Sequence, residues 1–497
     1  MKKYIFFVTN QDHWFNVAKD LYKNNIAEPV LWLGDDKHLI KAKELFGENV
    51  FHDLIHRHRN YKITETNYNG EFKEFFASNN YLRAKDRCIK MMDRLDLYGV
   101  FGRLDREVYF HNLLIYYLKK IYDVKPDVLI TAENPHDYPK YIIYEICDFI
   151  GIPCYKFYNW MLSPLLFLQN IKSNKIIKKS STIPKNLDKK FENDVNQFIE
   201  KLKNRQKEYE LYYMKSQRIK SKIMPSILNF ISKDFINILK DFKHNSEMLL
   251  KGIYNPINPY RLNLLTRLYI KKRRKNNLLQ AFKTATEEIG IDNPFVYFPL
   301  HYEPEKTTNP DGGFFHDQFL ALVELRKIVP DNINILVKEH PSQFYSQMHG
   351  SKGRSPLFYK LIKNIKGIKL VDTKYDSLEL IKNSLFIATI TGSVAIEASI
   401  LGKKSLAFGK PWYMGCPNTF IWDGDITYNQ LIHSPLEPIS NVFDFLKNLK
   451  EMYSVPGFIN GSQRNHFKHY VDDEFELTQT QSIYSLLEEL FNKELYN

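Results

Sequence analysis

The sequence predicts an α/β protein with two α/β domains, a deep cleft between them and a helical insert that joins them. Three observations predict this organisation. The chain has 497 residues, too many for one ordinary hydrophobic core and enough for two or three domains. Short apolar runs alternate with amphipathic stretches in residues 1–160 and again from Asn293 onward. Between these parts glycine is nearly absent, while lysine and asparagine are frequent.

Residues 1–170 are predicted to form the N-terminal domain. The expected strands cover residues 4–8, 29–34 and 127–131. After the third strand the chain enters a polar loop, a helix begins near Pro139 and ends at Gly151, and the next strand starts at Pro153. That succession is a βαβ unit, in which a helix connects two parallel strands.

Three further segments complete the predicted organisation. Residues 171–290 are predicted as a basic helical insert, with one long amphipathic helix in FENDVNQFIEKLKNRQKEYELYYM. The α/β pattern then returns in a second domain, residues 291–450, and residues 451–497 are predicted as a C-terminal helical tail. Strands are expected in PFVYFP, NINILVK, GIKLVD, LFIATI and KSLAFG. Ligands of such sheets bind beyond the carboxyl ends of the strands, where the motifs described below occur.

The composition indicates the cellular compartment in which the protein is expected. No apolar run reaches the ~20 residues that a membrane-spanning helix needs. The N-terminal apolar run is too short for an export signal, so export is not expected. The four cysteines are scattered and form no CxxC pair, which predicts reduced thiols rather than a zinc site or disulfides. We therefore expect a cytoplasmic protein.

The net charge of +13 indicates an anionic partner. The excess gathers between Ile171 and Lys275, and KKRRK occupies residues 271–275. Because no nucleic-acid motif accompanies it, the pattern favours an anionic membrane surface, with the protein peripheral on the inner face of the cytoplasmic membrane, over nucleic acid. A solvated helical surface explains the pattern equally well.

The stretch around Gly392 predicts a strand that ends near Ile390, a tight turn and a helix. Backbone N–H groups at a helix start, with the hydroxyls of Thr391 and Ser393, suit a phosphate. Glu397, one turn further, suits the hydroxyls of a ribose. An ordinary serine-capped helix is at least as good an explanation of the spacing. Neither GxxxxGK[ST] nor GxGxxG is present, so no P-loop or dinucleotide motif is predicted.

INILVKEHPSQF, residues 333–344, predicts a buried strand that ends in charged residues and a proline. Pro341 forces the chain out of the sheet. His340 and Lys338 then stand at the cleft, and both can donate to an anion. A histidine beside a phosphate is expected to be partly charged and can protonate a leaving phosphate. The alternative is a surface loop with ordinary charges. Glu339 receives no role.

A long loop is predicted over residues 297–318, between a strand and a helix. Long loops inside compact domains are usually functional or disordered, and the interleaved Phe, Tyr and Pro residues favour a folded loop. His301 and Glu303 are its candidate polar groups near the strand end. Gly312 and Gly313 are expected to let the backbone approach a ligand closely.

Two polar loops follow strands in the first domain. TAENPHDYP contains Glu133 and Asp137, and NQDHW contains Asp12. A carboxylate from one domain that faces a nucleotide in the other is what a group-transfer enzyme needs. An N-capping loop is the alternative, and it suits Asp137 better than Glu133. The histidines of residues 52–59 have no second cluster to complete a metal site, so no metal is predicted.

At KEHP (338–341) and TGSVAIEASILGKKSLAFG (391–409) the sequence resembles the capsule-polysaccharide-biosynthesis group of bacterial glycosyltransferases. FPLHYEPE and GGFFHDQ are similar to the loop at the start of that group's C-terminal domain. The group includes Kdo transferases and nonulosonic-acid transferases that use CMP-sugars. The motifs cover roughly residues 295–410, while the N-terminal half matches in architecture only and the insert does not match.

The resemblance implies the GT-B fold, in which two Rossmann-like domains face a central cleft. It implies a nucleotide site made of Lys338, His340, Pro341, Thr391, Gly392, Ser393 and Glu397. It implies donor-sugar contacts from His301, Glu303, Gly312 and Gly313. The N-terminal domain is expected to bind the acceptor and supply the catalytic carboxylate, with Glu133 the first choice and Asp12 the second, while His340 assists the leaving phosphate. Inversion and retention both stay open.

The expected reaction moves a 2-keto-3-deoxy sugar acid (Kdo, or a nonulosonic acid such as sialic, pseudaminic or legionaminic acid) from a CMP-sugar to a glycan or glycolipid acceptor. The acceptor belongs to a capsule, a lipopolysaccharide O-antigen or a similar surface glycan. No cofactor and no metal are expected, because a helix start with a histidine and a lysine can stabilise a single phosphate. The alternatives are a CDP-alditol phosphotransferase of teichoic-acid-like synthesis and a non-catalytic membrane assembly scaffold.

Overall fold

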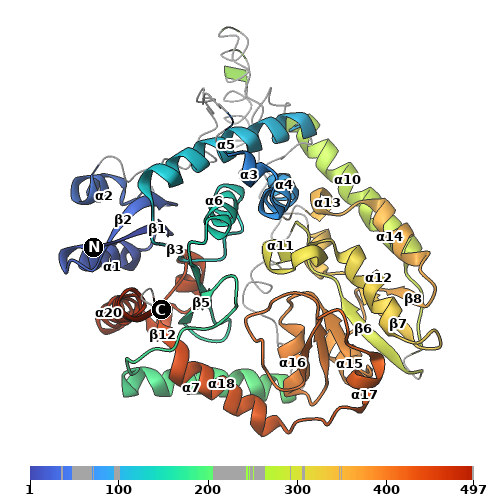
Figure 1. Ribbon diagram of the computed structural model, residues 1–497. Coiled ribbons are helices and arrows are strands. Elements are labelled where there is room, and N and C mark those ends of the chain that lie inside the picture. Colours follow the sequence, from blue (N-terminus) through green and yellow to red (C-terminus); the bar gives the residue numbers. More distant parts are fainter. Residues whose placement is uncertain are drawn as a thin grey trace. The chain divides into compact units, whose positions relative to one another are not determined.

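The computed structural model divides into two compact units, and each is described by itself (Figure 1). Unit 1 comprises Met1–Lys90, Glu107–Glu200 and Asp444–Asn497, and unit 2 comprises Met91–Arg106 and Lys201–Phe443. The structure describes residues 1–34, 37–47, 70, 72–94, 101–204, 242–243, 246, 250, 264–290, 293–304, 308–345, 348 and 350–494. For residues 264–268, 493 and 494 it describes the backbone alone. The histidines of residues 52–59 lie outside these ranges.

Unit 1 contains a six-stranded sheet in the order β12-β5-β4-β3-β1-β2. Its strands are β1 (Lys2–Phe7), β2 (Ala27–Leu33), β3 (Val128–Thr131), β4 (Cys154–Asn159), β5 (Leu165–Asn170) and β12 (Ser454–Pro456). The first four pair in parallel, and β5 runs antiparallel to both of its neighbours. The chain order reverses between β1 and β3, which makes that pair the switch point of the sheet.

Burial on both faces explains the apolar runs of these strands. Tyr4–Phe7 of β1 is fully buried, as expected of a parallel strand that helices cover on both sides. The helices wholly or largely in unit 1 are α1 (Asp12–Lys23), α2 (Leu39–Phe46), α3 (Lys73–Phe76), α4 (Asn79–Met91), α5 (Arg103–Val124), α6 (Tyr138–Phe149), α7 (Lys185–Lys203), α18 (Ile439–Tyr453), α19 (Gly461–His466) and α20 (Asp473–Glu489). The predicted βαβ unit is confirmed as β3, α6 and β4.

The C-terminal segment is part of unit 1, so the prediction of a separate helical tail at residues 451–497 is wrong. β12 extends the sheet beside β5, and Ser454 accepts a hydrogen bond from the indole of Trp160 at 3.0 Å. α20 packs against α1 and places Leu487 in the core of the unit. Partners nearly 300 residues away in β5 and Trp160, and still further away in α1, decide this, and a local pattern contains no sign of them.

The described part of the predicted insert, residues 171–290, does not form a unit of its own. Its first helix, α7, lies almost wholly in unit 1, where Phe191 stacks on Tyr470 at 5.3 Å. Its last helix, α10 (Leu264–Ala285), packs against unit 2 through Leu278 and Phe282. The two described ends of the insert therefore belong to different units.

Unit 2 contains a six-stranded sheet in the order β8-β7-β6-β9-β10-β11, and all five pairs are parallel. Its strands are β6 (Phe295–Pro299), β7 (Asn334–Lys338), β8 (Ile368–Val371), β9 (Ile387–Thr389), β10 (Ser405–Ala407) and β11 (Thr419–Ile421). Counted along the chain within the unit, the order is 3-2-1-4-5-6, the Rossmann order. The prediction of α/β units with Rossmann-like sheets is confirmed, whereas the cleft between them stays a prediction.

Alternate strand residues of unit 2 enter two separate cores. Val296 and Phe298 of β6 pack in one, and Phe295 and Tyr297 pack in the other. The other helices wholly in this unit are α11 (Thr308–Asp311), α12 (Gln318–Ile328), α13 (Gly350–Gly353), α14 (Pro356–Lys363), α15 (Ser377–Asn383), α16 (Val394–Ile400) and α17 (Tyr428–His433). Such double burial explains why the strands are continuous apolar runs with no polar alternation.

The described helices and cysteines agree with two expectations from composition. No described helix is both long enough and apolar enough to cross a membrane. All four cysteines are buried thiols without a disulfide.

We expect Leu487→Ala to lower the free energy of unfolding by about 2–5 kcal/mol, because the side chain is fully buried against α1. The matched control is Leu477→Ala on the same helix, where the side chain is 60% exposed and the loss should stay below about 0.5 kcal/mol. Urea unfolding followed by circular dichroism measures both. Equal, small losses would mean that α20 is a detachable tail.

Candidate functional site

The reversal of strand order in unit 2 locates the candidate site. β6 leads along the chain to β7 and β8 on one side, while β9 to β11 lie on the other. In open α/β sheets, ligands bind beyond the carboxyl ends of the two strands at such a switch. After β6 the chain reaches His301, and after β9 it reaches Thr391 and Gly392.

His301 connects the two strand ends. Its Nε2 lies 3.2 Å from the Thr389 hydroxyl and accepts a 3.4 Å hydrogen bond from the Thr391 N–H, so the neutral ring carries its proton on Nδ1. Burial, with nearby His340 and Arg354, lowers the pKa of His301 to about 3. The ring is therefore neutral at physiological pH.

His340 follows β7, the neighbour of β6. Its Nδ1 accepts a 3.2 Å hydrogen bond from the Ser342 N–H, which leaves the proton of the neutral ring on Nε2. Burial, with the cations of Lys338 and Arg354, lowers the pKa of His340 to about 4. The ring is therefore neutral and can donate through Nε2, and the expectation of a partly charged histidine beside a phosphate stays a prediction.

The turn after β9 contributes a buried hydroxyl. Thr391 is 9% exposed, and its Oγ1 has no hydrogen-bond partner among the described residues. Gly392 lies against the His301 ring, because a Cβ at Gly392 would come within 3.4 Å of it and within 2.8 Å of the Thr389 hydroxyl. A buried hydroxyl without a partner costs about 1–3 kcal/mol, which a ligand that accepts from Thr391 would recover.

Ser393 and Glu397 bond to each other at the start of α16. The Ser393 hydroxyl donates to Glu397 at 3.1 Å and makes no capping bond to the helix. Burial raises the pKa of Glu397 to about 7, although the Ser393 hydrogen bond acts in the opposite direction. Glu397 can therefore change its protonation near neutral pH. Because α16 has only seven residues, its dipole adds little to the site.

Lys338, a predicted phosphate ligand, has partners inside unit 2. Its ammonium donates to the Tyr375 carbonyl at 2.5 Å and to the Ser377 hydroxyl at 2.8 Å. Burial lowers the pKa of Lys338 to about 8, although the nearby Asp376 and Asp372 act to raise it. Lys338 lowers the pKa of His340, but its ammonium is already hydrogen-bonded at the start of α15.

Glu303 lies in a buried polar network. Its carboxylate accepts a 3.0 Å hydrogen bond from Gln318, and its backbone exchanges two hydrogen bonds with Gln343. The side-chain amide of Gln318 also accepts a hydrogen bond from the His301 N–H and donates one to the His301 carbonyl. Glu303 thus supports the loop that presents His301, a role that sequence analysis does not predict.

The two glycines of the loop differ. A Cβ at Gly312 would come within 2.5 Å of the Thr308 carbonyl and 2.9 Å of the Ile390 side chain, so Gly312 allows the loop to pack on the end of β9. These protein atoms leave no room for a Cβ, and that explains why residue 312 is glycine without the predicted close approach to a ligand. Gly313 has a φ of +58° and open space around it. Pro341 begins a short 3₁₀ helix, η4 (Pro341–Phe344), and the predicted exit from the sheet is confirmed.

Sequence analysis misses the charged residues behind the histidines. Glu339 is fully buried and forms a two-point ion pair with Arg354, with distances of 3.0 and 3.3 Å. Tyr359 donates to the same carboxylate at 2.7 Å. The one available signal was a glutamate inside a buried strand end, which requires a cationic partner.

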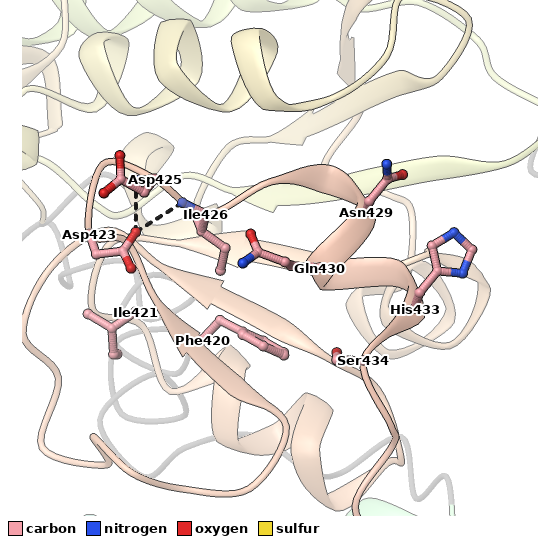
Figure 2. Close-up of a pocket in the computed structure, with 9 residues that line it drawn as sticks. All are labelled: Phe420, Ile421, Asp423, Asp425, Ile426, Asn429, Gln430, His433 and Ser434. Atoms are coloured by element: carbon pink, nitrogen blue, oxygen red, sulfur yellow. Dashed lines mark hydrogen bonds between the residues drawn. The ribbon is translucent and has the colours of Figure 1, made fainter.

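A separate hollow of about 770 Å³ lies at the edge of the same sheet, between β11 and α17 (Figure 2). Its lining includes Asp423 and Asp425 but none of the predicted site residues. Asp423 accepts hydrogen bonds from the N–H groups of Asp425 and Ile426, at 2.9 and 3.0 Å. Two carboxylates make this hollow unsuitable for a phosphate.

In unit 1 the switch between β1 and β3 brings the two candidate carboxylates to one edge of the sheet. Asp12, at the start of α1, is 65% exposed and accepts hydrogen bonds from Lys37 at 2.5 Å and His38 at 2.7 Å. Burial acts to raise the pKa of Asp12, but these hydrogen bonds outweigh it and hold the pKa below its usual range. Asp12 is thus an ionised, accessible carboxylate.

Glu133 follows β3 and contacts a lysine. The Lys140 ammonium lies 3.1 Å from Glu133 and 3.9 Å from Asp137, and His136 lies within 3.9 Å of both carboxylates. Glu133, His136 and Asp137 could each offer a ligand atom to a metal ion. The lysine already supplies a cation to both carboxylates, which weakens the case for a metal there. The side chain of Asp137 makes no capping bond to α6.

No family model matches the chain, and no curated protein matches its sequence. Among solved structures, a KpsC β-Kdo 2,7-transferase from Thermosulfurimonas dismutans is 11% identical, with a TM-score of 0.27, over 66% of this chain and 79% of that one. The UDP-GlcNAc 2-epimerase of Neisseria meningitidis is 12% identical, with a TM-score of 0.20, over 98% and 99%. That of Methanocaldococcus jannaschii is 14% identical, with a TM-score of 0.18, over 94% and 100%. At such TM-scores these similarities add nothing to what the strand order shows.

We expect Glu397→Gln to stabilise the protein at pH 8 by about 1–3 kcal/mol and to change little at pH 4.5. The pKa of Glu397 rises to about 7 on folding, so wild-type stability should fall as the pH rises from the unfolded pKa toward 7. Glutamine cannot ionise and removes that loss. Urea unfolding at both pH values measures the effect.

The control for this change is Glu379→Gln, at an exposed position on α15. It should leave the difference between the two pH values as it is in the wild type. A Glu397→Gln protein with the wild-type pH dependence would contradict the raised pKa.

Proposed function

We propose that the protein is a GT-B-type glycosyltransferase that moves a 2-keto-3-deoxy sugar acid from a CMP-sugar to a surface-glycan acceptor. One observation carries the proposal. Near the strand switch of unit 2, the neutral His301 senses the neutral His340 and accepts from the Thr391 N–H, and the Thr391 hydroxyl has no hydrogen-bond partner among the described residues. The sequence resemblance, which rests on the same segments, supplies the substrate class.

The chemistry of these groups suits the phosphate of CMP. When the bond between sugar and phosphate breaks, negative charge grows on the phosphate oxygen, and donors already in position there stabilise it. His340 Nε2–H and the Thr391 hydroxyl are two such donors. Because neutral donors supply this stabilisation, we propose a reaction without metal.

Unit 1 would supply the catalytic carboxylate that activates the acceptor hydroxyl. Both carboxylates have cationic or histidine partners, but Asp12 is the better candidate because its side chain is 65% exposed, whereas that of Glu133 is 20% exposed and contacts Lys140. A base in this role gives inversion, and a carboxylate that attacks the sugar gives retention. The ranking of Asp12 above Glu133 reverses the order that the sequence favours.

We expect His340→Ala to weaken CMP binding by about tenfold or more, equal to at least ~1.4 kcal/mol, through loss of the Nε2–H donor. Isothermal titration with CMP measures it. His433→Ala is the matched control, because His433 is exposed on α17 and lines the hollow of Figure 2. Weaker binding in the control with unchanged binding in His340→Ala would move the nucleotide to that hollow.

Product analysis separates the proposal from its alternatives. Incubation with CMP-Kdo and CMP-nonulosonic acids should release CMP and add one ulosonic acid to the acceptor. An added alditol phosphate from a CDP-alditol would instead identify a phosphotransferase. If no CMP-sugar or CDP-alditol is turned over, a non-catalytic scaffold is favoured.

We further propose that α10 holds the protein at an anionic membrane surface. Its five consecutive cations, residues 271–275, include exposed side chains at Lys272, Arg273 and Arg274. Arg274 also lines a hollow of about 440 Å³ whose lining contains no carboxylate. Such a segment gains about 1 kcal/mol per cation near anionic lipid.

We expect replacement of Lys272, Arg273 and Arg274 by glutamate to abolish sedimentation with phosphatidylserine vesicles at 0.1 M salt. Replacement of Lys360, Lys363 and Lys366, exposed lysines in and just after α14, changes the net charge equally and should leave sedimentation intact. Equal losses in both proteins would reduce the effect to net charge, and no binding by the wild type would contradict the membrane proposal.

A further inference from the structure

Glu339 is the most fully bonded carboxylate near the candidate site. One of its oxygens accepts from the backbone N–H of His340 at 2.8 Å and from Arg354 at 3.3 Å. The other accepts from Arg354 at 3.0 Å and from Tyr359 at 2.7 Å. The carboxylate therefore has four donors and fixes the backbone on which the His340 ring is mounted.

Arg354 extends the network to the second histidine. Its Nη2, which reaches Glu339, also donates to the His301 carbonyl at 2.9 Å. The guanidinium lies over the Phe358 ring at 4.3 Å, which fixes its plane. One arginine thus links the segment after β6, which contains His301, to the segment after β7, which contains His340.

Stability alone gives a weak reason for an ion pair at this place. Both side chains are almost completely buried, at 0% exposed for Glu339 and 3% for Arg354. Removing two charges from water costs about as much as their attraction returns, and well-packed apolar residues often replace such pairs without loss. What an apolar replacement cannot provide is the directed bonding to two strand ends.

We propose that the Glu339–Arg354 ion pair, completed by Tyr359, is a positioning device that holds His301 and His340 in place for the phosphate of the donor. The proposal rests on the proposed function of the same site. Glu339 and Arg354 are positioning residues, because they act through the backbone of the histidines.

The surroundings of the two rings support this role. Charged groups that influence His340 are Lys338 on its own strand and Arg354 from the segment before α14. His301 senses Arg354 and His340. Because Glu339 neutralises Arg354 at close range, the guanidinium can hold both backbones without becoming a competing anion site itself.

Arg354→Lys is the informative variant, because it keeps the charge but loses the planar fork that serves Glu339 and His301 together. Arg326→Lys is the matched control. Arg326 donates to the carbonyls of Val329, Pro330 and Ile333 at the amino end of β7, the opposite end of the same strand. Tyr359→Phe is a second, milder variant that keeps the ion pair and removes one donor.

Two measurements on the full-length protein separate positioning from general stability. Titration with CMP gives affinity, and ¹⁵N spectra of histidine-labelled protein report which ring nitrogen carries the proton. His301→Ala and His340→Ala assign the signals. We expect CMP affinity to fall about tenfold in Arg354→Lys and two- to threefold in Tyr359→Phe, with unchanged affinity in Arg326→Lys. In Arg354→Lys the His340 signals should show a mixture of the two tautomers.

The outcomes are distinguishable. If the wild type does not bind CMP, the proposed function fails, while altered His340 signals in Arg354→Lys would still support positioning. If the wild type binds CMP and both Arg354→Lys and Tyr359→Phe keep wild-type affinity and signals, the positioning role is overturned and the function stands. Should Arg354→Lys fail to fold, Tyr359→Phe against Arg326→Lys decides: a change in Tyr359→Phe alone supports the role, and its absence contradicts it.

Discussion

The reversal of strand order between β6 and β9 is the constraint on which the candidate site depends. Since the connections diverge to either side of these two strands, the polar residues at their carboxyl ends lie where ligands of open α/β sheets bind, and they can face a ligand without disturbing the apolar runs behind them. His301 bonds across the switch to Thr389, which lies 88 positions away in the sequence. The site is thus a consequence of the sheet order, and the side chains only complete it.

Burial then determines the charge of this edge. The two histidines are neutral, Lys338 is bound to the start of α15, and the charges of Glu339 and Arg354 cancel within 3.0 Å. This edge of the sheet therefore offers hydrogen-bond donors with little net positive charge. Neutral donors lack the Coulomb attraction that a charged donor adds to its hydrogen bond with an anion. The phosphate that the proposed reaction releases would leave such a site more readily than a cationic clamp.

Local patterns predict the elements well and the partners poorly. The runs at β1 and β7, the turn at Gly392 and the exit at Pro341 follow from period and from backbone chemistry, and each lies within a residue or two of its predicted place. What fails depends on distant contacts. The C-terminal segment joins unit 1 through β5 and α1, Lys338 finds Ser377, and Glu339 finds Arg354 and Tyr359 on a later segment. A glutamate at a buried strand end indicates that a cationic partner exists, but the local sequence does not identify that partner.

The two units differ in the groups near their strand switches. Unit 2 offers the hydrogen-bond donors of His340 and Thr391 near the ends of β7 and β9, whereas unit 1 offers Asp12 and Glu133 after β1 and β3. A phosphate and a carboxylate base on one crevice would repel each other, and each would raise the other's pKa. Placing them on separate units lets Asp12 remain ionised by Lys37 and His38 while the donors of unit 2 remain available to an anion.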